Sequence, residues 1–133
     1  MILEQFPLTA LATIAALFVY FYCMIMVGRT RMKLGIKPPS TEGPEEFLRV
    51  NRVHQNMVEQ LVMHLPALWL FAAAWGDLWA GILGFVFAVG RILYARGYYE
   101  AAEKRSRGFG IASLATIILT LGALIGTLMA MFG

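Results

Sequence analysis

Four long apolar segments alternate with polar connections along this chain of 133 residues. They run from about Phe6 to Val27, from Leu61 to Trp75, from Leu78 to Tyr99 and from Phe109 to Phe132. The second segment is preceded by an amphipathic portion that begins near Pro44. With that portion, each segment approaches the roughly 20 residues that a helix needs to cross the hydrocarbon core of a bilayer. The pattern predicts an all-α integral membrane protein, a bundle of four transmembrane helices formed as a single domain over residues 1–133.

Turn-forming residues separate the apolar segments where the chain must reverse. The sequence GIKPPSTEG at residues 35–43 joins the first two segments and is rich in glycine and proline. The second and third segments meet at WGDLW, residues 75–79, whose two tryptophans we interpret as side chains at headgroup level. Residues 1–27 lack a basic start and a small-residue cleavage site, so we expect a retained helix rather than a signal peptide.

The basic residues set the expected topology. All eleven Lys and Arg residues fall within residues 29–52 and 91–107. Four spans place these two stretches on one side of the membrane and both termini on the other. By the positive-inside rule the basic side is cytoplasmic and the termini face outward, where the charged side chains are Glu4 and Asp77.

Composition excludes other classes of protein. A hydrophobic share of 59% gives more apolar surface than a soluble domain of this length can bury, whereas lipid solvates such a surface. The net charge of +3 follows from loops that flank apolar spans, so we expect no nucleic-acid partner. The single cysteine, Cys23, excludes a disulfide framework within one chain.

A polar stretch leads into the second span. At about 100° per residue, Arg52, Asn56 and Glu59 share one face of the expected helix, and His54 points nearly the opposite way. The stripe continues into an apolar segment. Ionisable groups at this depth are costly, so they need partners or a polar ligand.

A second stripe lies on the third span, because Arg91, Tyr94 and Tyr98 are spaced i, i+3, i+7. Arg105 follows about two turns later, at the entrance to the fourth span. The two stripes together fit a small zwitterionic peptide that carries a thiol. Arginine and tyrosine bind its carboxylates, Glu59 holds its ammonium, and an arginine favours its thiolate. Glutathione is such a peptide, although the spacing alone does not name it.

Structural roles are the alternative for the same side chains. Arg52, Glu59 and Arg91 are equally suited to pair with one another and lock the bundle. The two tyrosines are also typical of an interfacial belt, and the arginine before the fourth span is typical of a positive-inside residue. His54 and His64, ten residues apart without a cysteine partner, do not make a metal site.

The two stripes resemble a known family. They lie in GPEEFLRVNRVHQNMVE at residues 43–59, followed by Pro66, and in GRILYARGY at residues 90–98, followed by Arg105. These sequences resemble the membrane-associated proteins in eicosanoid and glutathione metabolism, the MAPEG family. The likeness covers roughly residues 26–126 and includes the four-span layout. The paired stripes are specific, whereas either one alone is a weak signal.

The resemblance implies a homotrimer of four-helix subunits, with glutathione sites between neighbouring subunits that open toward the cytoplasmic side. It implies that Arg105 stabilises the thiolate of glutathione, the co-substrate. The second reactant is a hydrophobic electrophile or lipid that enters from the bilayer. The resemblance also assigns the residues that bind glutathione: Arg31, Arg52, Asn56, Glu59, Tyr94 and Tyr98.

Within the family, the chain is similar to the general glutathione transferases. Leukotriene C synthases have a tyrosine after the glutamate of the stripe and adjacent arginines after the first span. This chain has Gln60 at the first point, and Met32 follows Arg31 at the second. His54 is similar to the histidine of the microsomal glutathione transferase and prostaglandin E synthase branches. The compact chain is bacterial in style, so we expect a bacterial inner-membrane enzyme that conjugates hydrophobic electrophiles or reduces lipid hydroperoxides.

Two other functions stay open. A non-catalytic lipid-binding branch exists in the same family, and the retained polar stripes argue against it here. Small four-span drug exporters have a similar length, but they depend on a carboxylate embedded in the first span. In this chain the first span has only Glu4, at its outer end.

Overall fold

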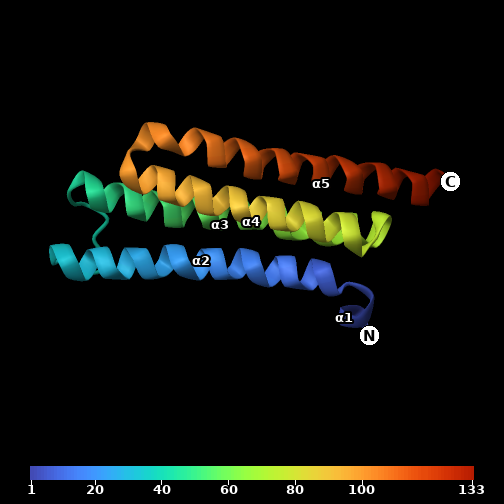
Figure 1. Ribbon diagram of the computed structural model, residues 1–133, viewed down its shortest axis with the longest axis horizontal. Coiled ribbons are helices and arrows are strands. Elements are labelled where there is room, and N and C mark those ends of the chain that lie inside the picture. The colour runs from blue at the N-terminus through green and yellow to red at the C-terminus, as the bar shows by residue number, and fades with distance from the viewer.

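The computed structural model describes residues 1–133 and confirms the all-α prediction (Figure 1). Its elements in chain order are α1 (Ile2–Gln5), α2 (Pro7–Leu34), α3 (Glu45–Trp75), α4 (Asp77–Glu100), the 3₁₀ turn η1 (Ala102–Arg105) and α5 (Ser106–Phe132). Four helical segments, with η1 and α5 counted as one, are long and apolar enough to cross a membrane. The chain is an integral, multi-pass membrane protein.

The four long helices form an elongated bundle in which α3 and α4 lie between α2 and α5 (Figure 1). Both α2 and α5 pack against α3 and α4. The two termini and the α3–α4 turn lie at one end, which we call the terminal end. The α2–α3 connection and η1 lie at the opposite end, which we call the basic end because it carries the Lys and Arg residues.

The first long helix extends beyond its apolar segment. We expected it to end near Val27, but α2 continues to Leu34 and stops where Gly35 takes a left-handed conformation, with φ of 68°. Hydropathy marks only the part of a helix that lies in hydrocarbon, while backbone hydrogen bonding continues into the headgroup region. The first three basic residues therefore belong to a helix and not to a loop.

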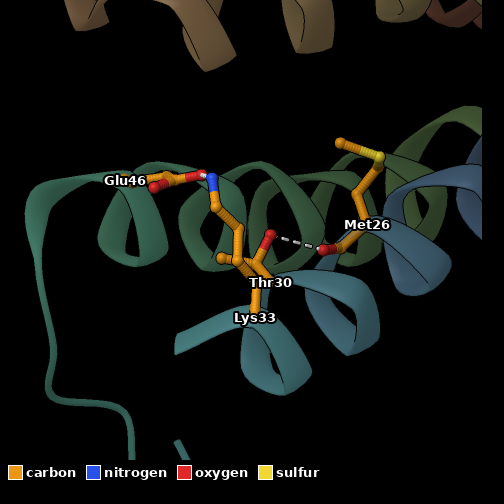
Figure 2. Close-up of polar contacts among 4 residues, drawn as sticks. All are labelled: Met26, Thr30, Lys33 and Glu46. Carbon is orange, nitrogen blue, oxygen red and sulfur yellow. Dashed lines mark hydrogen bonds and ion pairs between the residues drawn. The ribbon is translucent and has the colours of Figure 1, made fainter. Parts of the chain in front are cut away.

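Side-chain contacts hold this extension in place (Figure 2). The hydroxyl of Thr30 donates to the carbonyl oxygen of Met26 over 2.8 Å, within α2. The ammonium of Lys33 lies 2.7 Å from a carboxylate oxygen of Glu46, in the first turn of α3. The end of α2 is thus tied to the start of the helix that carries the first polar stripe.

At the terminal end, the carboxylate of Asp77 joins two helices. It accepts hydrogen bonds from the backbone amide of Leu8 over 2.9 Å and from that of Thr9 over 2.7 Å. The Thr9 hydroxyl donates to the same carboxylate over 2.8 Å. The first amides of a helix have no acceptor within the helix, so the first residue of α4 caps α2. We call this set of contacts the Asp77 clamp.

Two glycines bring α4 and α5 together near the basic end. A Cβ atom on Gly108 would collide with the backbone of Tyr94 and Gly90, and one on Gly90 would lie 2.7 Å from the amide nitrogen of Ala112. Only residues without a side chain allow this approach. The contact sets the start of α5 against the stripe of α4 that carries Tyr94.

Candidate functional site

A polar pocket of about 580 Å³ lies near the basic end, where α3, α4 and the start of α5 meet. Five of the predicted site residues line it, and they come from α3, α4 and the turn η1. The lining residues are Arg52, Asn56, Tyr94, Tyr98, Arg105, Ser106, Phe109 and Gly110.

On α3, the predicted stripe forms a connected polar row. One guanidinium nitrogen of Arg52 lies 3.2 Å from a carboxylate oxygen of Glu59. The side-chain amide of Asn56, which lies between them, donates to the same oxygen over 3.4 Å. Arg52 and Glu59 are both exposed, whereas Asn56 is buried. A solvent-exposed ion pair of this kind adds little stability to the fold. Both charged groups are therefore accessible from solvent and can exchange their mutual contact for contacts to a ligand.

On α4, the two tyrosines stand side by side on the wall of the pocket. The ring centroids of Tyr94 and Tyr98 are 5.6 Å apart in an edge-to-face arrangement. Arg91 lies behind them, with its guanidinium carbon 4.1 Å from the centre of the Tyr94 ring. Arg91 is buried, and none of its guanidinium nitrogens has a hydrogen-bond partner. Arg91 does not pair with Glu59, so only Arg52 and Glu59 of the three residues that could brace the bundle form an ion pair.

The turn η1 places Arg105 at the edge of the pocket. Its guanidinium donates to the carbonyl oxygen of Ala102 and lies 5.7 Å from the centre of the Tyr98 ring. The side chain is exposed and makes no ion pair. Its positive charge therefore faces the pocket without a protein counter-charge.

Arg31 lies apart from this pocket within the single chain. Its guanidinium donates to the carbonyl oxygen of Ser40 over 2.8 Å and lies 4.9 Å from the centre of the Phe47 ring. Arg31 thus braces the α2–α3 connection. Glu59 does not line the pocket either, but it contacts the lining residues Arg52 and Asn56.

Three lining residues were not predicted from the sequence: Ser106, Phe109 and Gly110. They lie on the first turns of α5, just after Arg105. Their spacing of three and four residues puts them on one helix face, and this signal was available once Arg105 had been placed at the helix start. Phe109 stands out because it also lines a second, apolar cavity.

That second cavity is an apolar groove of about 860 Å³ between α3 and α5. We call it the α3–α5 groove. Its walls are mostly aliphatic and lie on the outside of the single chain. They include Met63, Pro66 and Leu70 of α3 and Ile117, Leu121 and Leu124 of α5. Because Phe109 borders both cavities, the groove reaches the polar pocket without an intervening helix.

A buried histidine lies beneath the groove. The His64 ring stacks on Phe87 with centroids 3.5 Å apart, and its Nδ1 lies 3.4 Å from the hydroxyl oxygen of Thr116. Thr116 also lines the groove. No three His, Cys, Asp or Glu side chains come together as a set that would hold a metal ion.

Comparison with known proteins gives a consistent result. The MAPEG family matches residues 9–125. An uncharacterized protein of Synechocystis is 52% identical over 90% of this chain and 87% of its own length. Human microsomal glutathione S-transferase 2 is 40% identical over 76% of this chain and 71% of its own length. Bovine leukotriene C4 synthase is 27% identical over 94% of this chain and 83% of its own length.

Proposed function

Since this chain belongs to the MAPEG family, we propose that it is a membrane glutathione transferase that uses the polar pocket for glutathione and the α3–α5 groove for a hydrophobic electrophile. One observation carries the proposal: a pocket lined by cations, an amide and two phenols adjoins an apolar groove at Phe109. A reaction between a charged peptide and a lipid-soluble compound needs such a pair of adjoining sites. The name of the human relative, microsomal glutathione S-transferase 2, supports glutathione chemistry.

In the proposed complex, Arg52 and the tyrosines bind the carboxylates of glutathione, and Glu59 binds its ammonium. Arg52 and Glu59 already lie 3.2 Å apart, so their opposite charges present a preformed dipole to a zwitterion. The pocket has an excess of positive charge, because its lining includes two arginines and no carboxylate. This excess matches a peptide that carries two carboxylates and one ammonium.

Arg105 is the proposed catalytic residue. Its guanidinium makes no ion pair, so a thiolate beside it gains an unshared positive partner. A hundredfold shift of the thiol equilibrium toward thiolate corresponds to about 2.7 kcal/mol. A single arginine in a partly desolvated pocket is sufficient for that shift.

The proposed reaction balances in both forms. In conjugation, the thiolate attacks an electrophilic carbon, a carbon–sulfur bond forms, and the leaving group departs with the electron pair of its former bond. In peroxide reduction, two glutathione molecules reduce one hydroperoxide to an alcohol and water, and they are oxidised to the disulfide. The lipid-soluble reactant enters through the α3–α5 groove, which lies open on the outside of the single chain.

The assembly and orientation are part of the same proposal. A homotrimer would place Arg31 of one subunit, which lies outside the pocket of its own chain, within reach of a neighbour's site. The excess of Lys and Arg at the basic end supports a cytoplasmic position for that end and an outward position for both termini, in a bacterial inner membrane. Cross-linking of the purified protein and cysteine accessibility in intact cells test these two points.

The first experiment is ultraviolet difference absorbance of the purified protein mixed with glutathione, which detects thiolate. We expect a signal in the wild type and none in Arg105→Ala. Arg107→Ala is the matched control, because Arg107 is also exposed at the start of α5 but does not line the pocket. An equal signal in wild type and Arg105→Ala would overturn the catalytic role of Arg105.

A lipid-presenting protein without catalysis is the second candidate, and the size of the α3–α5 groove favours it. Such a protein binds a lipid in the groove and leaves the thiol of added glutathione intact. Loss of free thiol that depends on an added electrophile supports the transferase. Absence of both thiolate and glutathione binding would mean that the polar stripes only brace the bundle, and it would leave lipid presentation as the function.

A further inference from the structure

A second apolar groove, of about 600 Å³, lies between α2 and α4. We call it the α2–α4 groove. It shares no lining residue with the polar pocket or with the α3–α5 groove. Buried Val19 and Ala88 form its floor, and the exposed side chains of Phe18, Phe85 and Val89 form its walls. The proposed glutathione chemistry makes no use of this part of the molecule.

The groove has the length of one bilayer leaflet. On α4 its lining extends from Phe85 to Arg96, a rise of about 16 Å at 1.5 Å per residue. Half of a hydrocarbon core of about 30 Å is about 15 Å. The groove also runs along the helices, toward the basic end. Its dimensions therefore suit an acyl chain of a lipid in the leaflet on that side.

Positive charge marks the headgroup end of the groove. Arg96 is the one charged residue of its lining. Arg29 lies two turns beyond Tyr22 on the same face of α2, and Tyr22 lines the groove. Both arginines are exposed, and neither takes part in any ion pair of the chain.

The carboxylate one turn after Arg96 makes its ion pair with another residue. Glu100 lies one turn after Arg96, but its carboxylate is 2.9 Å from the ammonium of Lys104. A bound anion at this end of the groove therefore meets the guanidinium of Arg96, which makes no ion pair of its own. Guanidinium groups bind phosphate with paired hydrogen bonds.

We propose that the α2–α4 groove binds an anionic phospholipid of the bilayer, with an acyl chain along the groove and the phosphate at Arg96, while Arg29 adds positive charge farther along the same side of the bundle. The juxtaposition of a leaflet-length apolar groove and Arg96, which lines it and makes no ion pair, carries this assignment. The lipid serves as a ligand of the outer surface of the bundle and not as a substrate. The proposal holds whether or not the polar pocket binds glutathione.

Native mass spectrometry of the detergent-solubilised protein tests the proposal. Phosphatidylglycerol and phosphatidylcholine with identical acyl chains are added in equal amounts, and the lipids retained per subunit are counted. We expect the wild type to retain phosphatidylglycerol preferentially. Arg96→Gln should lower this preference by about fivefold, and Arg29→Gln/Arg96→Gln should lower it further.

Two further variants separate a site from general surface charge. Arg107→Gln removes the same charge from an exposed position at the start of α5, outside the groove, and should leave the preference unchanged. Val89→Trp fills the groove from an exposed position and should reduce retention of phosphatidylglycerol even though both arginines are present.

Four results would overturn the assignment. Equal retention of the two lipids by the wild type would remove the role of the headgroup. An equal loss in Arg107→Gln would show a nonspecific charge effect, and full retention in Val89→Trp would remove the role of the groove. A changed subunit number in Arg29→Gln/Arg96→Gln, with lipid binding unaltered, would identify this face as an interface between copies of the chain.

Discussion

The two ends of the bundle differ in how fully their buried polar groups are satisfied. At the terminal end the polar side chains have protein partners: Asp77 accepts three hydrogen bonds, and the indole of Trp75 donates to the carbonyl oxygen of Gly122 over 2.8 Å. Most buried polar atoms without partners lie in the half nearest the basic end, on Arg49, His54, Asn56, Arg91 and Tyr99, and one more lies on His64 near the middle of the bundle. Buried polar groups are usually satisfied. Of these residues, Asn56 lines the polar pocket and Arg91 lies behind the Tyr94 ring, so part of the unsatisfied polarity lies where we propose that a ligand binds.

The largest expected effect comes from separating α4 and α5, the helices that pack closely near the basic end. Gly108→Val would push a side chain into the backbone of α4 at Gly90 and Tyr94, where no flexible group can move aside. We expect a loss of about 3 kcal/mol or more in the free energy of unfolding, together with loss of glutathione binding. Thermal unfolding in detergent measures the first effect, and equilibrium binding measures the second.

Gly28→Ala is the control for Gly108→Val. A Cβ atom at Gly28 meets no other atom within 4 Å, and alanine favours the helix that contains it. This variant should be as stable as the wild type or more stable. If Gly108→Val unfolded at the wild-type temperature, the close approach of α4 and α5 would not be what forms the pocket.

The next largest effect should be a loss of stability that arises at the terminal end and leaves the polar pocket at the basic end unchanged. Asp77→Ala removes the acceptor for the amides of Leu8 and Thr9, so the free energy of unfolding should fall by about 2 kcal/mol. Asp77→Asn keeps one acceptor oxygen and should lose less. Below the unfolding temperature, the glutathione thiolate signal should match that of the wild type. A loss of thiolate in the folded variant would show that the polar pocket depends on the contacts at the terminal end.

A smaller effect is expected at the basic end, where a substitution should lower glutathione affinity without lowering stability. Arg52→Gln removes one partner of an exposed ion pair, so the unfolding temperature should stay within error. Glutathione affinity should fall about tenfold, because a charge-assisted contact to a carboxylate is lost. Arg49→Gln is the control, since Arg49 pairs with Glu45 one turn away and does not line the pocket. Equal affinities in wild type and Arg52→Gln would remove Arg52 from the site.

The smallest effect concerns Arg91, which is buried without a hydrogen-bond partner. Arg91→Met has a similar volume and no charge, so we expect the free energy of unfolding to change by less than about 1 kcal/mol or to rise. Glutathione affinity should fall about threefold, because Tyr94 loses the cation behind its ring. A large loss of stability would instead place Arg91 among the structural residues of the bundle.

Much of this arrangement could be predicted from the sequence. Hydropathy and turn residues identified the four spans and the reversal at Trp75–Asp77. Helical periodicity placed Arg52, Asn56 and Glu59 on one face, and the structure brings them within hydrogen-bonding distance. Both signals are local, because each depends on spacing within one helix.

The remaining features depend on contacts between helices, which spacing within one helix does not encode. The convergence of α3, α4 and α5 depends on the glycine contact at Gly90 and Gly108. The α5 side of the pocket also depends on η1, which turns the chain before α5 begins. Arg31 was assigned to the pocket by resemblance, and the single chain places its guanidinium on Ser40 instead.

The Asp77 clamp also has a consequence for how the protein is made. Its hydrogen bonds join residues that are 68 and 69 positions apart in the sequence. Because synthesis proceeds from the N-terminus, α2 leaves the ribosome before the residue that caps it exists. The amides of Leu8 and Thr9 acquire their acceptor only when the first residue of α4 has been added to the chain. The first span therefore acquires its complete set of N-terminal hydrogen bonds only after residue 77 has been translated.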